Sequence, residues 1–484
     1  VIGLFSFLGS RGLVEPDEGR YAEIGREMAA TGEWLVPHLN GFPHFQKPPL
    51  LYWATAVSIR VFGANEWAAR LPSAFSALGV VLLIALIGER LFQRKTGLAA
   101  AFILLSTVGF FGLARLLTPD MTLTFWTTAA VACVVQYQFV GGRRAWAWLF
   151  FAALGCGFLT KGPMALIVPL SAAITAQTVL RRRGESRPLP WTLGLTLSFA
   201  IGLSWFVALS LWKGELFDYF WRYELVERFA SASHGRSQPI WFFIPVILIA
   251  LIPWVFWLPR LVQPAWRRLK ERAAAPSGWL LLGWTLPPFL ILSLSGSKLP
   301  TYILPLLPPI ALALGHWLVR GSAVLPVWIP RTAVATLAVC LGATVAFPRF
   351  NDALKQQASL RDLIRPLATE PGLRTARIYA VEVRSHGLEF YLRRLVSATE
   401  QQSDIVLEPT SAERRRLISS DHFKSGAIEP KPGESPVFVL TRRGRAQKSF
   451  PLERWSRHGT AGDFILLKSR ASRIPAFAET HPLR

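Results

Sequence analysis

Residues 69–89, ARLPSAFSALGVVLLIALIGE, form an almost uninterrupted apolar segment. The hydrocarbon core of a membrane is about 30 Å thick, so a helix needs roughly 20 apolar residues to cross it, and this segment has that length. The rest of the chain agrees, because its mean hydropathy is +0.34 and only 17% of its 484 residues are charged. Such a composition excludes a soluble enzyme and indicates an integral membrane protein.

Similar apolar segments recur on both sides of this one. We therefore expect an α-helical polytopic membrane protein with about eleven to thirteen transmembrane helices, the first of them truncated. The candidate spans are residues 1–10, 69–89, 98–114, 121–140, 145–159, 163–180, 190–211, 239–259, 278–295, 301–319 and 324–347.

Lysine and arginine residues in the short loops predict the orientation, because such residues are enriched on the cytoplasmic side. The intervening loops, and everything after about residue 347, are then expected to face outward. The basic loops contain Arg90, Arg94 and Lys95; Arg143 and Arg144; residues 181–187; and Arg260, Arg267, Arg268, Lys270 and Arg272.

The net charge of +23 is explained by these basic loops and a basic tail. No nucleic-acid partner is needed to account for it. The three cysteines, Cys133, Cys156 and Cys340, all lie in predicted spans, so neither a disulfide framework nor a zinc site is indicated.

The first outward loop, residues 11–68, has its own organisation. Residues 17–34 read as an amphipathic helix ended by Gly32, and residues 50–63 as a second helix, both expected to lie in the membrane interface. Between them, LVPHLNGFPHFQKPP at 35–49 is rich in Pro and Gly and predicts an ordered turn region. Lys47 lies at its exit, where a lysine commonly extends to the membrane surface.

Carboxylates are concentrated in the same loop, in EPDEGRYAE at 15–23. Asp17 and Glu18 begin the predicted helix, where the helix dipole favours acidic residues, so a purely structural role stays open. Asp120 follows Pro119 at the start of an apolar span, where an N-cap is the structural alternative. A carboxylate so close to hydrocarbon is costly and is also a functional candidate.

Three further outward segments carry cations, and two of them also carry aromatic residues. Residues 160–162 contain Lys161, and residues 295–309 contain Lys298 and Tyr302. Cations and aromatic rings at headgroup depth suit a ligand that is apolar at one end and anionic at the other, although a membrane-surface belt looks similar. We expect one outward-facing cavity lined by two carboxylates and several cations. The third segment, 213–239, contributes Glu224, Arg228, His234 and Arg236.

This combination of groups suits sugar transfer from a lipid-phosphate carrier. Breaking the bond between an anomeric carbon and a phosphate oxygen leaves an anionic lipid phosphate, which cations stabilise. A carboxylate can deprotonate a hydroxyl acceptor or pair with an amino group on the sugar.

The same motifs resemble those of the bacterial aminoarabinose (4-amino-4-deoxy-L-arabinose, lipid A) transferases, GT-C glycosyltransferases related to protein mannosyltransferases. The resemblance covers about residues 1–350 and is carried by PDEGRYAEIGREM, FQKPPLLYW, the Asp120 loop, TKGP and SKLPTYILP. It implies a multi-pass protein of the bacterial inner membrane whose site faces the periplasm. Its donor would be an undecaprenyl-phosphate sugar, its acceptor lipid A or another lipid or glycan, and membrane lipids would surround it.

The resemblance also implies roles for individual residues. Asp17 would be the principal catalytic or donor-sugar carboxylate, and Asp120 the second acidic residue. One position departs from the family, because Gln46 stands where the family usually has Glu. This puts both the sugar and any metal in doubt, so we predict no cofactor while a divalent metal stays open. Donor phosphate or lipid binding falls to Arg20, Tyr21, Lys47, Lys298 and Tyr302, and candidate substrate contacts to Glu18, Gln46, Lys161, Glu224, Arg228, His234 and Arg236.

After residue 347 the apolar spans stop. Residues 348–470 are expected to form a small outward α/β domain, with strands in ARIYAVEV, LEFYLRRLVSA, PVFVLTRRG and FILLKS, and 471–484 a disordered tail. The alternatives to aminoarabinose transfer are a GT-C transferase with another polyprenyl-phosphate sugar and a different glycan, lipid or protein acceptor, and a transporter or flippase of polyprenyl-linked sugars. Transporters tend to show internal repeats and charges near mid-membrane. No repeat is found here and the charges lie on one side, which favours the transferase.

Overall fold

The chain divides into two compact units, and each is described by itself. In the computed structural model the first unit comprises Val1–Leu8, Gly32–Pro37 and Phe45–Val345, and the second comprises Gly9–Thr31, His38–His44 and Ala346–Arg484. The structure describes residues 2–214, 216, 238–261, 275–350, 359–364, 376–381, 386–393, 397–398, 437–444, 446, 450, 454–461 and 463–470.

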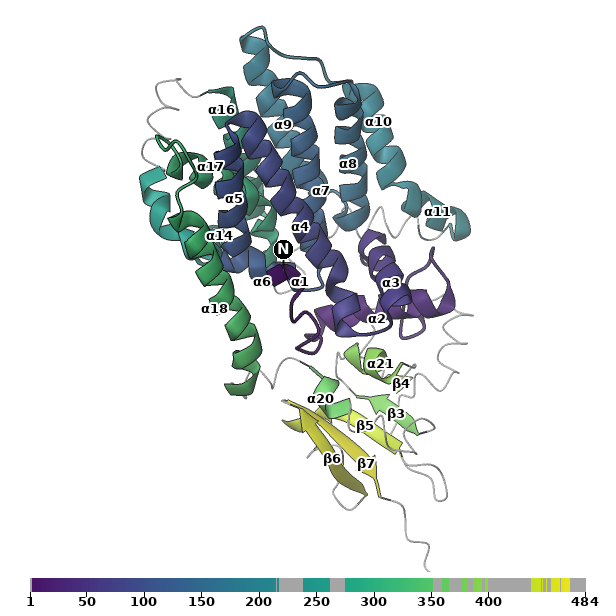
Figure 1. Ribbon diagram of the computed structural model, residues 1–484. Helices are drawn as coiled ribbons and strands as arrows, with labels where there is room; N and C mark the ends of the chain where they lie inside the picture. Colours follow the sequence, from purple (N-terminus) through teal and green to yellow (C-terminus); the bar gives the residue numbers. More distant parts are fainter. Residues whose placement is uncertain are drawn as a thin grey trace, which may run out of the picture. The chain divides into compact units, whose positions relative to one another are not determined.

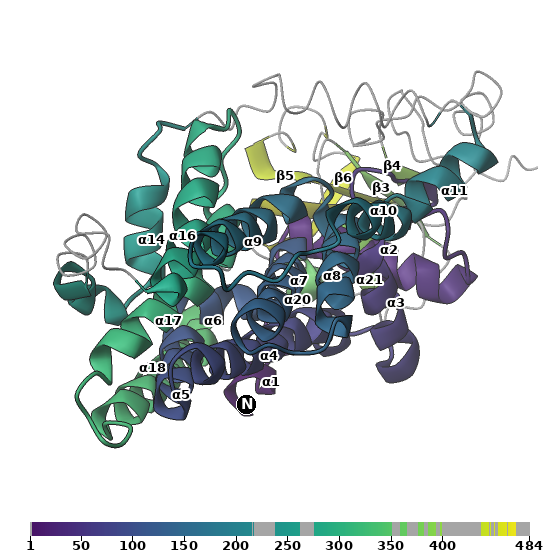
Figure 2. The ribbon, with the colours of Figure 1, turned by 90° about the horizontal axis from the view of Figure 1, so that it is seen from above.

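The first unit is a bundle of apolar helices packed side by side. Figure 1 shows these helices in a common orientation, and Figure 2 shows them nearly end-on. Small residues allow the closest approach, because a Cβ added to Gly88 would lie 2.5 Å from the Cα of Gly97 on the next helix. The central helices are α4 (Glu66–Leu91), α5 (Arg94–Ser106), α7 (Pro119–Val134), α8 (Ala145–Lys161), α9 (Met164–Arg182) and α10 (Trp191–Gly202).

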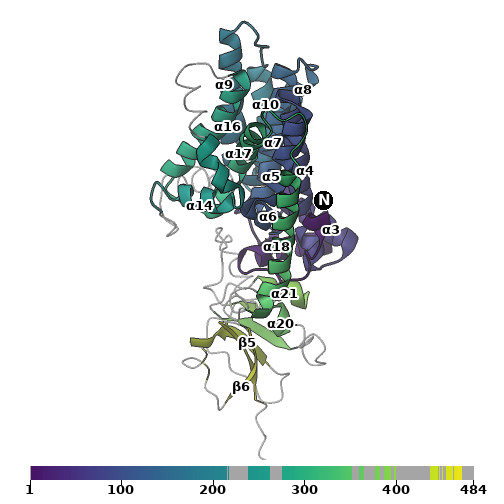
Figure 3. The ribbon, with the colours of Figure 1, turned by 60° about the vertical axis from the view of Figure 1, so that its left-hand side comes forward.

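Further helices complete this unit. Figure 3 shows α16 beside α9, and α17 packs against α5. They are α1 (Ile2–Phe5), α3 (Leu50–Phe62), α6 (Val108–Ala114), the π-helical η1 (Val135–Phe139), α11 (Ser204–Trp212), α14 (Phe243–Ala250), the 3-10 helices η3 (Trp254–Trp257) and η4 (Pro300–Leu306), α16 (Pro276–Leu294), α17 (Leu307–Leu318) and α18 (Trp328–Phe350).

Five of the described helical segments are long and apolar enough to cross a membrane, or up to eight if each bent pair is one span. The shorter α8 and the combination of α7 with η1 coincide with two more predicted spans. Of the truncated span expected at 1–10, the structure shows α1, which has four residues and is followed by turns. Buried Arg115 donates to the carbonyl of Gly3 over 2.9 Å.

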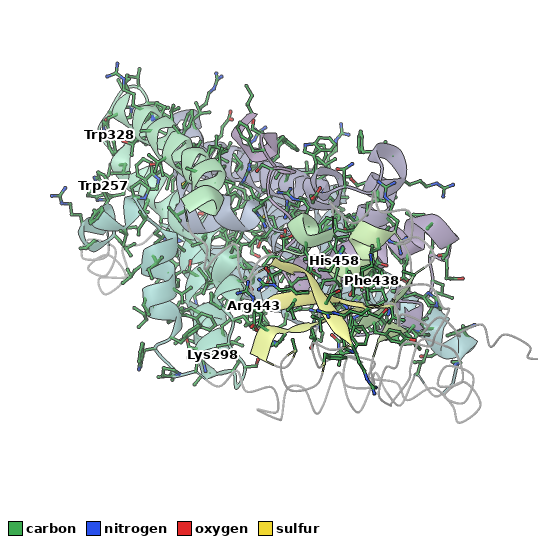
Figure 4. The ribbon with its side chains drawn as sticks, turned by 90° about the horizontal axis from the view of Figure 1, so that it is seen from below. Trp257, Lys298, Trp328, Phe438, Arg443 and His458 are labelled. Carbon is green, nitrogen blue, oxygen red and sulfur yellow. The ribbon has the colours of Figure 1, made fainter. Side chains whose placement is uncertain are left out.

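Two of the bent pairs support each other at their breaks. α5 and α6 meet at 69°, and the helices on either side of the break after α14 meet at 108°. The N–H of Val108 donates to the carbonyl of Ile252 over 3.0 Å, and Trp254 Nε1 donates to Ser106 Oγ over 2.9 Å. The first bond satisfies backbone groups that the breaks remove from their helices, as a membrane interior requires, and the second joins two buried side chains beside the same breaks. Nearby, Figure 4 shows Trp257 beside Trp328, and their rings stack with centroids 5.5 Å apart.

The second unit contains a five-stranded sheet in the order β4-β3-β5-β7-β6. β3 pairs in parallel with β4 and with β5, whereas β7 is antiparallel to β5 and β6. Leu388, Phe438 and Leu466 belong to one buried cluster of the unit, and Trp455 and Phe450 to a second cluster. The strands are β3 (Arg377–Ala380), β4 (Ser397–Ala398), β5 (Val437–Arg442), β6 (Trp455–Ala461) and β7 (Phe464–Ser469), with helices α20 (Arg361–Ile364) and α21 (Gly387–Leu392).

Part of the first predicted loop belongs to this second unit. Helix α2 (Asp17–Thr31) packs against α21, and a hairpin of β1 (His38–Leu39) and β2 (Phe42–Pro43) follows it. The hairpin turns at Asn40 and Gly41, whose φ values of 53° and 79° suit the Asn-Gly pair. The two helices expected at 17–34 and 50–63 are thus both present, as α2 and α3.

The secondary structure of the C-terminal part differs from expectation in two places. LEFYLRRLVSA was predicted to be a strand, but its first half forms α21, and the strand among its described residues is Ser397–Ala398. The helix is favoured because it buries Leu388, Glu389 and Phe390 in succession against neighbouring elements, which an alternating strand could not do. Strand β6 was not predicted, since its sequence WSRHGTA is polar. The tail at 471–484 lies outside the described residues.

Candidate active site

Asp120 lies in the first turn of α7 and is 5% exposed. Asp120 is not the N-cap of the helix, which was the structural alternative for it, because the N-cap is Thr118 and Pro119 takes the first helical position. Proline suits that position, since its missing N–H would have no partner there anyway. The Asp120 carboxylate therefore stays available for another group, while the positive end of its own helix favours its charge.

Lys161 supplies that group from the end of α8. Gly162, at φ 66°, ends the helix in a conformation that a side chain would strain. The Lys161 Nζ forms an ion pair with Asp120 Oδ1, and the two side chains are only 9% and 7% exposed. An ion pair so shielded from water interacts far more strongly than one on a surface, and either charge alone would be costly there.

Tyr302, in η4, adds an aromatic face to the same ammonium. The Lys161 Nζ lies 4.3 Å from the centroid of the Tyr302 ring. A cation over a partly desolvated ring is attracted by its negative face. Residues from α7, α8 and η4, all in the first unit, are thereby brought together. We call Asp120, Lys161 and Tyr302 the lysine cluster.

Lys298 does not join this cluster through any contact that the structure describes. Its Nζ donates to the carbonyls of Ser295, over 2.7 Å, and Gln238, over 2.9 Å. It is 7% exposed and is labelled in Figure 4. An ammonium carries three N–H groups, and among the described residues these two bonds leave the third N–H for an anion.

Gln46 and Lys47 are half-buried, in the stretch that leads into α3. The neighbouring stretch is held in place by two indole groups. Trp53 Nε1 donates to the carbonyl of Trp34 over 2.7 Å, and Trp205 Nε1 donates to the carbonyl of Leu35 over 2.8 Å. The first unit therefore orders the region around these two candidate residues.

The acidic motif belongs to the second unit. Asp17 is exposed, with 60% of its side chain accessible, and its Oδ1 accepts from Arg20 Nη2 over 2.6 Å. The Arg20 guanidinium lies 5.4 Å from the centroid of the Tyr21 ring. Glu18 is buried and accepts from Arg11 over 2.7 Å and from the N–H of Val14 over 3.0 Å. These contacts favour a structural role for Glu18 and leave Asp17 on the surface of its unit.

Four buried or partly buried carboxyl groups of this unit escaped the sequence analysis as a group. Burial raises the pKa of Glu15 and of Glu389 to about 8. Burial also raises the pKa of Glu23 well above its usual range, although Arg26, which donates over 2.6 Å, opposes the shift. Glu27 accepts from the N–H of Gly41 over 2.9 Å. The motif EPDEGRYAE and the spacing of Glu23 and Glu27 on one helix were signals for three of these groups, whereas Glu389 is far away in sequence.

Four candidate residues, Glu224, Arg228, His234 and Arg236, lie outside the described residues. Among the residues that are described, no group of three or more His, Cys, Asp or Glu side chains is arranged to hold a metal ion.

Comparison with known proteins places these features in context. The family model for dolichyl-phosphate-mannose-protein mannosyltransferase matches residues 8–220. A protein of Erwinia tasmaniensis named undecaprenyl phosphate-alpha-4-amino-4-deoxy-L-arabinose arabinosyl transferase is 36% identical over 63% of this chain and 55% of its own length. A protein of Proteus mirabilis with the same name, numbered 2, is 34% identical over 64% of this chain and 56% of its own length. The chain thus spans about half the length of these relatives, and the resemblance that the motifs suggested is confirmed.

Solved structures show the same fold. The crystal structure of ArnT from Cupriavidus metallidurans bound to undecaprenyl phosphate superposes with a TM-score of 0.77 and 23% identity, covering 97% of this chain and 96% of that one. An Archaeoglobus fulgidus oligosaccharyltransferase tethered to an acceptor peptide superposes with a TM-score of 0.52 and 11% identity, covering 89% of this chain and 65% of that one. The expected fold class, a polytopic helical protein of GT-C type with a small C-terminal α/β domain, is confirmed.

Proposed function

We propose that this protein is a membrane glycosyltransferase that takes 4-amino-4-deoxy-L-arabinose from undecaprenyl phosphate and places it on lipid A. The observation that carries the proposal is the lysine cluster. Lys161 presents a shielded positive charge between a carboxylate and an aromatic ring, an arrangement suited to a lipid-borne phosphate. The names of the similar proteins support the choice of donor.

In this reaction the bond between the anomeric carbon and the carrier phosphate oxygen breaks, and its electron pair stays on that oxygen. The acceptor oxygen forms the new bond to the same carbon. The carrier phosphate gains negative charge as the sugar leaves, and a fixed cation stabilises that charge most in the transition state. We assign this role to Lys161, oriented by Asp120, with Lys47 as a second cation.

The role of Asp17 depends on the acceptor. A lipid A phosphate is already anionic and needs no general base, so Asp17 would then pair with the amino group of the sugar. A sugar hydroxyl would instead need Asp17 to take its proton. The exposed carboxylate is compatible with both, since it is held by Arg20 over 2.6 Å and is otherwise accessible.

Gln46 favours a second candidate within the same reaction type. It replaces the acidic residue expected before Lys47, which removes one negative charge that an amino sugar could use. A transferase for another polyprenyl-phosphate sugar, with a different glycan, lipid or protein acceptor, is therefore the alternative. In either case we place residues 1–347 as the catalytic part in the bacterial inner membrane. The polar loops and the α/β domain at 348–470 then face the periplasm.

Mass spectrometry of lipid A and surface glycans from cells with and without the gene tests this proposal. An added pentosamine mass on lipid A is the expected result. An added hexose or hexosamine, on lipid A or on another glycan, would move the assignment to the alternative. Unchanged lipid A and glycans in cells that contain the protein in their membranes would overturn the transferase.

A further inference from the structure

We propose that Glu15 is a positioning residue for Asp17, holding the turn before α2 against the start of α21; this rests on the proposed role of Asp17. All the residues involved belong to the second unit. The C-terminal domain would accordingly contribute to catalysis by fixing a carboxylate that the N-terminal part of the chain carries.

Hydrogen bonds join the two segments along the approach to Asp17. The N–H of Gly387 donates to Glu15 Oε1 over 2.8 Å, and the N–H of Leu13 donates to Tyr391 Oη over 2.8 Å. Arg361 donates to the carbonyls of Gly9, over 3.2 Å, and Ser10, over 2.9 Å. Residues 9–15 are thus attached to residues 361–391 at several points, and the last attachment lies two positions before Asp17.

The packing at this point leaves no room for an additional methyl group. A Cβ added to Gly387 would lie 2.1 Å from Glu15 Oε1, and one added to Gly19 would lie 2.6 Å from the N–H nitrogen of Gly387. Because real Cβ atoms do not approach other atoms so closely, either change must displace Glu15 or the backbone. Glycine at both positions therefore permits the contact on which the position of α2 depends.

The environment of Glu15 favours the uncharged form of its side chain. Its Oε2 is buried and has no hydrogen-bond partner within the described part of the chain. Burial raises its pKa to about 8, and the nearby charges of Glu18 and Asp17 act in the same direction, against the N–H groups of Gly387 and His386. At neutral pH the group is then mainly uncharged, so glutamine, which has the same shape, should replace it.

Asp17 differs from Glu15 in being exposed and held mainly by Arg20. Its position relative to the rest of the unit is set by the backbone on either side of it. A displacement of about 1 Å in a catalytic group can cost on the order of 10²-fold in rate. Loosening the Glu15 contact is therefore expected to affect turnover more than donor binding.

Steady-state kinetics of the full-length protein in detergent test this inference. Gly387→Ala is expected to lower kcat about 10- to 100-fold and to leave the KM for the donor within about twofold. Glu15→Gln should retain most activity, because its amide oxygen still accepts from Gly387. The matched control is Gly444→Ala in the same unit, since a Cβ there meets nothing within 4 Å among the described residues. Tyr391→Phe, which removes the acceptor for Leu13, provides a second variant if Gly387→Ala does not fold.

A double-mutant cycle with Asp17→Glu separates positioning from general damage. In Asp17→Glu the carboxylate is already misplaced. Adding Gly387→Ala should therefore lower the residual kcat of that variant far less than Gly387→Ala lowers the kcat of the native protein. The inference would be overturned if Gly387→Ala lowered kcat by the same factor in the native and the Asp17→Glu proteins. It would also be overturned if kcat were unchanged in both Gly387→Ala and Tyr391→Phe. The proposed function would survive those results if Asp17→Asn still abolished turnover. Normal turnover in Asp17→Asn would remove Asp17 from the mechanism and overturn this inference as well.

Discussion

The Nζ of Lys161 lies 4.3 Å from the centroid of the Tyr302 ring and at the same time forms an ion pair with Asp120. Asp120 and Tyr302 both belong to the first unit, and neither is a substrate group that leaves during a reaction. The cation is held ready before a substrate arrives, so little reorganisation is needed when a phosphate gains charge. Most of the chemistry that we propose depends on this preorganisation.

Removing the cation from this pair should damage both activity and stability. Lys161→Met leaves the Asp120 carboxylate without its partner in a shielded place, which costs about 3–5 kcal/mol. Thermal melting in detergent and a transfer assay measure the two effects. The double variant Lys161→Met/Asp120→Asn should recover much of the melting temperature but none of the turnover. Native-like turnover in Lys161→Met would exclude it from the site.

The aromatic ring should matter more than its hydroxyl group. Tyr302→Phe keeps the ring face and is expected to bind the donor within about twofold of the native protein. Tyr302→Leu loses a cation–π contact worth about 0.5–2 kcal/mol. Because that contact holds Lys161 where we expect the donor phosphate to bind, the donor affinity should fall, by at most about 30-fold. Titration with the polyprenyl-phosphate sugar measures both. The prediction fails if Tyr302→Phe is the more damaging change.

The carboxylate of Asp17 should be needed for transfer and not for donor binding. Asp17→Asn keeps nearly the same shape and still accepts from Arg20, but it cannot take a proton or carry a charge. We expect turnover to fall by about 10²-fold or more, while the donor still binds. Binding of the donor lipid and product formation should be measured on the same preparation. Full activity in this variant would contradict the prediction.

The second unit should lose stability as the pH rises. Glu15 and Glu389 have native pKa values of about 8 against an ordinary value of 4.5. Between these values the unfolded chain releases protons that the native state keeps, so the free energy of unfolding falls as pH rises and levels off above about 8. Hydrogen exchange in α21, corrected for the intrinsic pH dependence, measures this change from pH 6 to 9.

Glu389→Gln provides the control for this pH dependence. The amide cannot ionise, so residue 389 no longer makes the free energy of unfolding depend on pH. The protection of α21 against hydrogen exchange should then vary less with pH. The group interacts with Glu15 and Glu27 and, in the opposite sense, with Arg26. If the protection of α21 in Glu389→Gln depends on pH as strongly as in the native protein, the Glu389 carboxyl group is not the source of that dependence.

Transfer should continue in the presence of a chelator. We expect Lys47 and Lys161 to supply the positive charge that a divalent ion would otherwise bring to the carrier phosphate. Activity should be the same with and without EDTA in an assay of purified protein. Loss of activity in EDTA, restored by one divalent ion, would show that a metal is required.

The secondary structure was largely predictable because its signals are local. Hydropathy placed most of the apolar helices, Gly32 marked the end of α2, and the apolar runs at 377–380, 437–442 and 464–469 indicated three strands. The failures have the same origin. The polar strand β6 is recognisable only through its pairing with β7, and α21 only through the surroundings that its side chains are buried in.

The candidate site was predictable as a set of residue types and not as a set of contacts. Asp120, Lys161 and Tyr302 were each singled out by their place beside apolar segments, and the sequence by itself determined that these groups would be costly there and in need of partners. Which partner each one takes was decided by the packing of α7, α8 and η4. That choice depends on how helices fit together over their whole length, which no local pattern encodes.

The same division holds for the acidic motif. The sequence alone determined that Asp17 and Glu18 begin a helix, because dipole and propensity act over a single turn. Only the tertiary structure made α2 part of the C-terminal unit and placed Glu15 against Gly387. A contact between residues so far apart in the chain needs the surface that the sheet and α21 provide for α2, and no local pattern can specify that surface.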